Sequence, residues 1–152
     1  MSETVTTAKP DAVPLLTDVR ELLRASELAD IIFYEVSASR ISEESEDTES
    51  PTFSMEIMTR TEPQVIEIRC KAHAAGAGGR YVSDASALFS LAKPVDIAED
   101  TVREFAEKVG VMAVYPYIRE SITQGGARLG LDRPVLPLLR AGEVKFNASD
   151  QG

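Results

Sequence analysis

Few residues in this chain could do chemistry, and their spacing does not bring them together. The sequence has one histidine, His73, and one cysteine, Cys70, in a segment where apolar and polar residues alternate. Side chains an odd number of positions apart in a strand point to opposite faces, so these two cannot share a metal ion. Cys70 falls with the apolar positions and predicts a buried packing thiol, whereas His73 predicts a surface residue without an acid or base partner. We therefore expect no catalytic residues and no enzyme activity.

Two further segments have the composition of ligand loops but not their pattern. Residues 75–79 read AGAGG, yet they lack the Gly-Lys-Ser/Thr ending of a phosphate-binding loop, so they predict a hairpin turn. Residues 42–50 carry five acidic residues and no basic one. They lack the alternating carboxylates and central glycine of a calcium-binding loop, and a segment of this kind favours a solvated loop. We expect no cofactor and no metal.

Composition indicates a single domain with a short tail at each end. The chain has 152 residues, of which 43% are hydrophobic, and a net charge of -9. That charge argues against a nucleic-acid partner, which needs clustered basic residues. The apolar runs fall short of the roughly 20 residues that span a bilayer, so no membrane insertion is expected. We expect a flexible tail over 1–13, a domain over 14–146 and a short tail over 147–152.

The location expected from the sequence is the cytoplasm. The first residues, MSETVTTAKPDAV, contain no basic region followed by an apolar stretch, so they do not resemble a secretory signal. A single cysteine excludes an internal disulfide and is typical of a reducing compartment.

The first two thirds of the chain predict one helix and four strands. Residues 14–28 show apolar residues at helical spacing, and residues 30–41 are rich in β-branched and aromatic residues, which favours a strand. Residues 53–60 and 66–74 alternate with period two around a turn at 61–64, and residues 80–91 follow the glycine-rich turn. One dry face, one wet face and short connections are typical of an antiparallel meander or a Greek key.

The last third changes to a helical period. Asp96 and Glu99 are spaced as a capping box, and an apolar stripe follows them as far as Ile122. Pro116 is expected either to kink this helix or to begin a new one, and Gly125 and Gly126 weaken its end. The fold class predicted is α+β: a four-stranded antiparallel sheet with an N-terminal helix and a long, Pro-interrupted C-terminal helix packed on one face.

Three segments of the last third resemble the SecB protein-export chaperones. Residues 114–123, VYPYIRESIT, are similar to the aromatic-Pro-Tyr-Ala-Arg-Glu pattern in the long helix of that family. Residues 133–139, RPVLPLL, are similar to its phenylalanine-proline-leucine segment, and residues 87–92 resemble the end of its last strand. With the order of the predicted elements, the resemblance covers roughly residues 30–139.

The resemblance implies an ATP-independent cytoplasmic holdase that keeps unfolded polypeptides in apolar grooves and passes secretory precursors to the SecA motor. It also implies a homotetramer built as a dimer of dimers. Apolar residues are the candidates for client binding: Phe33, Tyr34, Phe53, Met55, Met58, Leu136, Leu138 and Leu139. The alternative for each of them is that it packs the sheet against the helices. The residues implied to be structural, at the oligomer interface, are Tyr115, Pro116, Tyr117, Arg119 and Glu120. Asp84 is a candidate contact for a partner.

Departures from the export pattern point to a specialised branch. Export SecB proteins continue into a second C-terminal helix, whereas residues 140–152 here are short and broken by glycine. Export members also lack a helix before the first strand. Both features resemble the SecB-like chaperones associated with toxin–antitoxin systems, so the client expected is either a secretory precursor or an antitoxin. The alternative from another class is a non-chaperone oligomeric adaptor that binds one folded protein.

Overall fold

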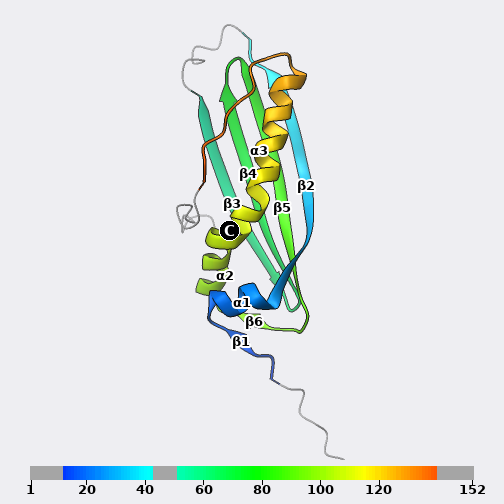
Figure 1. The fold of residues 1–152 in the computed structure, drawn as a ribbon, viewed down its shortest axis with the longest axis vertical. Helices are drawn as coiled ribbons and strands as arrows, with labels where there is room; N and C mark the ends of the chain where they lie inside the picture. Colours follow the sequence, from blue (N-terminus) through cyan, green and yellow to red (C-terminus); the bar gives the residue numbers. More distant parts are fainter. Residues whose placement is uncertain (1–11, 43–50, 140–152) are drawn as a thin grey trace, which may run out of the picture.

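The computed structural model describes residues 12–42 and 51–139 and has the predicted α+β fold (Figure 1). Its elements in chain order are β1 (Leu15–Leu16), α1 (Val19–Ala25), β2 (Ser26–Arg40), β3 (Thr52–Glu62), β4 (Val65–Gly76), β5 (Gly79–Leu91), β6 (Asp96–Ile97), α2 (Glu99–Phe105), the π-helix η1 (Ala106–Gly110) and α3 (Val111–Arg128). The predicted acidic loop, nearly all of the N-terminal tail and the residues after 139 lie outside the described ranges.

The four long strands form one antiparallel sheet in the order β2-β5-β4-β3. Strands β3, β4 and β5 follow one another through tight turns, and β2 lies beside β5 rather than beside β3. This is the Greek-key alternative of the two that the sequence left open. The glycine-rich turn forms the β4–β5 hairpin, and it needs glycine because the backbone there adopts positive φ, 84° at Gly78.

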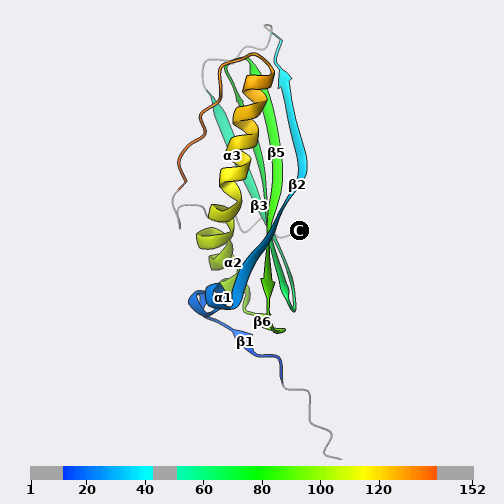
Figure 2. The ribbon, with the colours of Figure 1, turned by 45° about the vertical axis from the view of Figure 1, so that its right-hand side comes forward.

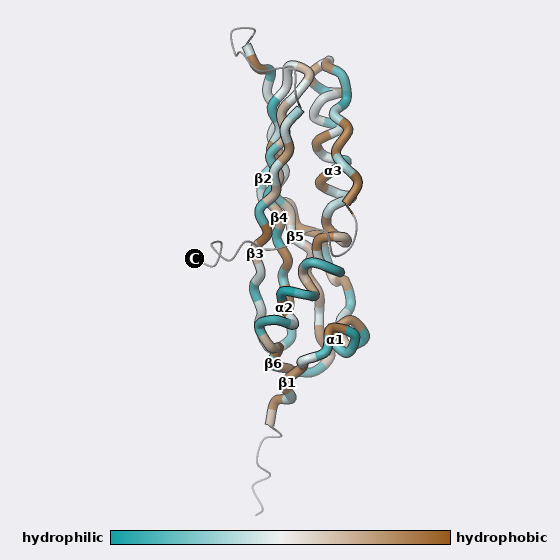
Figure 3. Tube along the Cα trace, turned by 90° about the vertical axis from the view of Figure 1, so that its left-hand side faces the viewer, coloured by the Kyte–Doolittle hydropathy of each residue, from teal (hydrophilic) through white to brown (hydrophobic). Residues whose placement is uncertain are grey.

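The helices form a second layer that covers one face of the sheet, as Figures 2 and 3 show from two sides. The covered face buries alternate residues of β4 and β5, among them Ile66, Ile68 and Cys70 with no exposed surface. Helix α3 packs on them through Val114 and Ile118, which are also fully buried. The alternation predicted for residues 66–74 is confirmed in β4 except at Glu67, which is 7% exposed on the opposite face, and the buried position of Cys70 is confirmed. Strand β5 buries residues on both of its faces, among them Asp84 and Ser86.

The N-terminal helix is shorter than predicted. Residues 14–28 were expected to be helical, but α1 spans only Val19–Ala25. Asp18 caps its start by accepting a hydrogen bond from the Arg20 amide at 2.9 Å. Before it, Leu15 and Leu16 pair in parallel with Asp96 and Ile97, which holds these two leucines in an extended conformation.

The predicted capping box at Asp96 and Glu99 is wrong. The Asp96 amide donates to the Pro14 carbonyl at 2.9 Å within the β1–β6 pair, so this residue belongs to a strand. Helix α2 begins at Glu99 after Ala98, whose side chain cannot cap it. Farther on, Pro116 lies inside α3 and neither ends the helix nor begins a new one.

Candidate functional site

An apolar surface, called the groove below, lies on the side of α3 that faces β3, where Phe53 and Tyr115 are in contact. Tyr115 of α3 is 4% exposed and packs edge-on against Phe53 of β3, with 6.3 Å between ring centroids and 77° between planes. Its hydroxyl donates a hydrogen bond to the carbonyl of Pro137. Burial raises the pKa of Tyr115, and the charge of Arg119 opposes this only in part. The hydroxyl therefore stays protonated and acts as a hydrogen-bond donor.

The segment of residues 131–139, called the C-terminal strap below, covers this groove. It leaves the end of α3, runs back beside the helix and has no regular secondary structure (Figures 1 and 2). The hydroxyl of Thr123 in α3 donates to the Pro134 carbonyl at 3.4 Å. Leu136 of the strap is 8% exposed. A cleft of about 530 Å³ between α3 and the strap has Pro116, Thr123 and Val135 in its lining.

The structure brings half of the candidate client-binding residues to this groove. Phe53 and Met55 are partly buried against the core from β3, and Leu136 and Leu139 meet the core from the strap. Leu138 belongs to the same strap and is 70% exposed.

Phe33 lies on the same face of the sheet, but at its opposite edge. It pairs with the buried Ala85, and cross-strand partners share a face. Its side chain is 43% exposed and that of Val36 is 53% exposed, so β2 presents apolar surface beyond the cover of α3. Sequence reasoning missed Val36, although its place in a β-branched run was a usable signal.

Two of the candidates, Tyr34 and Met58, lie on the other face of the sheet. Met58 pairs with Arg69, whose guanidinium carbon lies 4.0 Å above the centre of the Tyr34 ring. The Tyr34 hydroxyl donates to Glu67, which also accepts from Arg60 Nε at 3.0 Å. Tyr34 therefore belongs to a polar network on the open face and lies away from the groove.

This network keeps Glu67 charged although it is nearly buried. Burial by itself raises the pKa of the Glu67 carboxyl, but hydrogen bonds from Tyr34 and Arg60 help to outweigh it and leave the pKa below its ordinary value. The bond to Glu67 in turn raises the pKa of the Tyr34 phenol. The arrangement binds and orients charges, but it leaves no free nucleophile or base.

Asp84, the candidate partner contact, is held by the same face. It is 2% exposed and receives two hydrogen bonds from Arg69, at 2.9 and 2.7 Å. In the folded chain its carboxylate is thus covered by a guanidinium, and a partner would first meet Arg69. Its role as a contact stays a prediction.

The five residues implied to form an interface differ in burial. Tyr115 is buried in the groove, whereas Pro116, Arg119 and Glu120 are exposed on α3. Tyr117 is 43% exposed. Four of the five are therefore available on the single chain, and their place at an oligomer interface stays a prediction.

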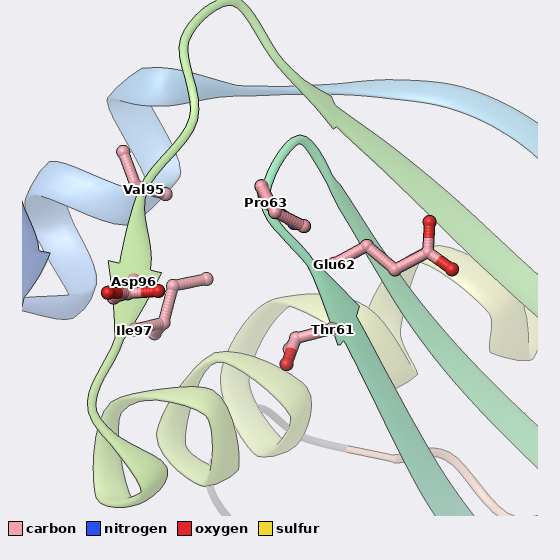
Figure 4. Close-up of a pocket in the computed structure, with 6 residues that line it drawn as sticks. All are labelled: Thr61, Glu62, Pro63, Val95, Asp96 and Ile97. Atoms are coloured by element: carbon pink, nitrogen blue, oxygen red, sulfur yellow. The ribbon is translucent and has the colours of Figure 1, made fainter. Parts of the chain in front are cut away.

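A second cavity, of about 290 Å³, lies at the opposite end of the molecule, between the β3–β4 turn and β6. Figure 4 shows the residues that line it. Thr61, Glu62 and Pro63 form one wall and residues 95–97 the other, and the Val95 amide donates to the Pro63 carbonyl at 2.9 Å. Glu62 is bound by Arg60. The cavity brings together no set of groups for catalysis. Within the described ranges no cluster of His, Cys, Asp and Glu could hold a metal ion, and no helix is long and apolar enough to span a membrane.

Comparison with known proteins decides the family. The SecB-like chaperone SmegB of Mycolicibacterium smegmatis is 52% identical to this chain over 139 residues, which cover 91% of this chain and 92% of that protein. This chain belongs to the SecB-like chaperones. No protein-family model matches the sequence.

A solved structure agrees with the fold of this SecB-like chaperone. It is the Mycobacterium tuberculosis Rv1957 SecB-like chaperone in complex with a ChAD peptide from the Rv1956 HigA1 antitoxin. The TM-score is 0.65 at 20% identity, and the match covers 80% of this chain and 92% of that one. The predicted resemblance to the SecB family is confirmed. Residues 114–123 lie in α3, and residues 133–139 lie in the strap.

Proposed function

We propose that this chain is an ATP-independent holdase that binds non-native polypeptides on apolar surface of its helical layer. The observation that carries the proposal is its 52% identity to a SecB-like chaperone over nearly the whole chain. The geometry supports it, because Phe33 and Val36 on β2 are exposed on the face of the sheet that carries this layer. A net charge of -9 favours solubility while such surface is exposed.

The client class that we propose is an antitoxin-type segment rather than a range of secretory precursors. The fold matches that of Rv1957, which was solved with a peptide from an antitoxin. An N-terminal helix before the long strands, which the export pattern lacks, supports the same branch. Delivery to SecA is the alternative. The chain can be tested with an antitoxin segment both as an unfolded peptide and within a folded antitoxin. Binding of the unfolded peptide alone would support a holdase rather than an adaptor that binds a folded partner.

The test is suppression of aggregation of an unfolded client without ATP. The chain should suppress aggregation at a few-fold molar excess, and Phe33→Ser should weaken this, because it removes apolar surface of β2 beside the helical layer. Leu15→Ser is the matched control, since Leu15 is 61% exposed but lies at the far end of the molecule near β6. No suppression at a large excess would refute the proposal. A folded partner that an unfolded apolar peptide cannot displace would favour the adaptor.

We also propose a cytoplasmic homotetramer arranged as a dimer of dimers. The described sheet leaves β2 and β3 each with one unpaired edge, and exposed Pro116 and Tyr117 on α3 offer a helical contact. Mass measurement in solution tests the assembly. A monomer at micromolar concentration would contradict it.

A further inference from the structure

The C-terminal strap is placed against α3 by a helix-ending turn. After α3 ends at Arg128, Gly130 adopts a φ of 70° and the Leu131 amide donates to the Gly126 carbonyl at 3.0 Å. With the Gly130 amide bonded to Ala127, this is a Schellman motif. It reverses the chain, so the strap lies beside the helix that precedes it (Figures 1 and 2).

The strap is held through features that any extended polypeptide presents. Tyr115 donates to the carbonyl of Pro137, and Thr123 lies 3.4 Å from the carbonyl of Pro134. Leu136, between those two prolines, inserts its side chain and is 8% exposed. The groove therefore recognises two backbone carbonyls three residues apart and one apolar side chain between them.

Little else fixes the strap in place. Proline has no amide proton, and no backbone–backbone hydrogen bond joins residues 132–139 to the other described residues. Val135 is 94% exposed. Leu136 and Leu139 reach the core from the strap, but α3 also packs on the sheet through Ile118 and Ile122, which are 0 and 1% exposed. Moving the strap would uncover Tyr115 and Phe53 without separating the two layers.

We infer that residues 131–139 are an internal pseudo-client: the strap fills the groove between α3 and β3 in the empty chaperone, and a client segment displaces it. This rests on the proposed holdase function and states how its site is regulated. The client segment favoured is extended and apolar, with free carbonyls on either side of a large aliphatic residue. Binding then competes with a tethered segment, so the observed affinity is the intrinsic affinity multiplied by the fraction of chains whose strap is undocked.

Two leucines of the strap provide a matched pair of variants. Leu136→Ala removes the buried anchor, whereas Leu138→Ala makes the same change at a position that is 70% exposed. The probe is fluorescein-labelled trypsin inhibitor, reduced and carboxymethylated so that it cannot fold. Leu136→Ala should bind it about tenfold more tightly than the parent chain, and Leu138→Ala within about twofold. Unchanged or weaker binding by Leu136→Ala would overturn the inference, because the strap would then be a fixed wall of the site.

A second pair releases the strap from the helix side. A Cβ at Gly126 would come within 2.5 Å of Pro134 Cδ and 3.0 Å of the Asp132 carbonyl oxygen, so Gly126→Ala should push the strap away. At Gly125 the new Cβ would instead meet Tyr81 and Ala38, which lie on the sheet. Gly126→Ala should therefore tighten binding as Leu136→Ala does, whereas Gly125→Ala should not. Equal affinities of these two variants for the inhibitor would contradict displacement of the strap by the client.

Release can also be observed directly, because the chain has no tryptophan. Leu139→Trp places a single reporter at a partly buried strap position. Saturation with the unlabelled, tryptophan-free inhibitor should move its emission to longer wavelength as the strap leaves the groove. An unchanged spectrum on bound client would refute displacement while leaving holdase function intact. Failure of the parent chain to bind the inhibitor at all would refute the proposed function and the inference together.

Discussion

Gly110→Ala should destabilise this protein although it adds a better helix former. Gly110 ends η1 with helical dihedral angles, a φ of -63° and a ψ of -49°, so alanine can adopt its backbone conformation. In a helix this exchange alone would stabilise by up to about 1 kcal/mol. The opposing effect is steric. A Cβ at this position would lie 2.4 Å from Ile68 Cγ1 and 2.7 Å from both Cβ and Cγ2 of the same residue.

The steric effect is the larger one, because Ile68 cannot move away. It is fully buried on the central strand β4, and one of the close atoms is its Cβ, which no rotamer change displaces. Overpacking of this kind costs about 1–3 kcal/mol, and the close approach to a Cβ favours the upper part of that range. The net expectation is a loss of about 1–2 kcal/mol, or roughly 2–8 °C in melting temperature.

Urea unfolding followed by far-ultraviolet circular dichroism measures this change at one fixed protein concentration. The midpoint should fall while the m-value stays constant. Ala127→Gly at an exposed position of α3 is the control for helix propensity, and it should lose no more than about 1 kcal/mol. A Gly110→Ala variant that is more stable than the parent would show that α3 can lift off β4 cheaply, which the packing described here does not allow.

Two further predictions concern buried polar groups. The Tyr81 hydroxyl is buried and has no hydrogen-bond partner among the described residues, so Tyr81→Phe should leave the free energy of unfolding unchanged or raise it by up to about 1 kcal/mol. Tyr115→Phe should lower it by about 1 kcal/mol, because the bond to the Pro137 carbonyl is lost. A clear loss of stability in Tyr81→Phe would disprove the argument from burial. Because the folded-state pKa of Glu67 is lowered, its stabilising contribution is complete above the ordinary pKa of a glutamate and is lost as pH falls through the lower, folded-state pKa. Glu67→Gln should therefore lower the free energy of unfolding by about 1–3 kcal/mol at pH 7, and its difference from the parent chain should vanish in acid. Unfolding curves from pH 7 to pH 2 measure this difference. A difference that stays constant over this range would contradict the reasoning.

The long strands were predictable because apolar and polar side chains alternate along them. The hairpin turns were predictable because glycine and proline occur there. Shorter elements were not. Two-residue strands such as β1 and β6 have no period, and the spacing of Asp96 and Glu99 matched a cap that tertiary pairing replaced. Local patterns identify a helix start only when no other segment competes for the same backbone groups.

The faces of β2 show why the candidate site was only partly predictable. Phe33 and Glu35 are two positions apart and should share a face, but a register shift between them places one opposite Ala85 and the other opposite Asp84. Tyr34 lies on the open face by ordinary alternation and joins Glu67, whereas the shift places Val36 opposite Ser83, on the same face as Phe33. A bulge of this kind depends on the partner strand, and no sequence pattern within β2 predicts it. The sequence of the strap resembles a family segment, but its contacts with Tyr115 and Thr123 depend on the chain reversal after α3, which no local pattern predicts.

The position of β2 beside β5 has a consequence for how the protein is made. During synthesis β2 leaves the ribosome first among the four long strands, yet its partner in the sheet, β5, is the last of them to appear. Strands β3, β4 and β5 can pair as they emerge, while the apolar β2 segment around Phe33 and Val36 waits without a partner. A nascent chain of this chaperone thus passes through a state that an already folded copy could recognise as a client.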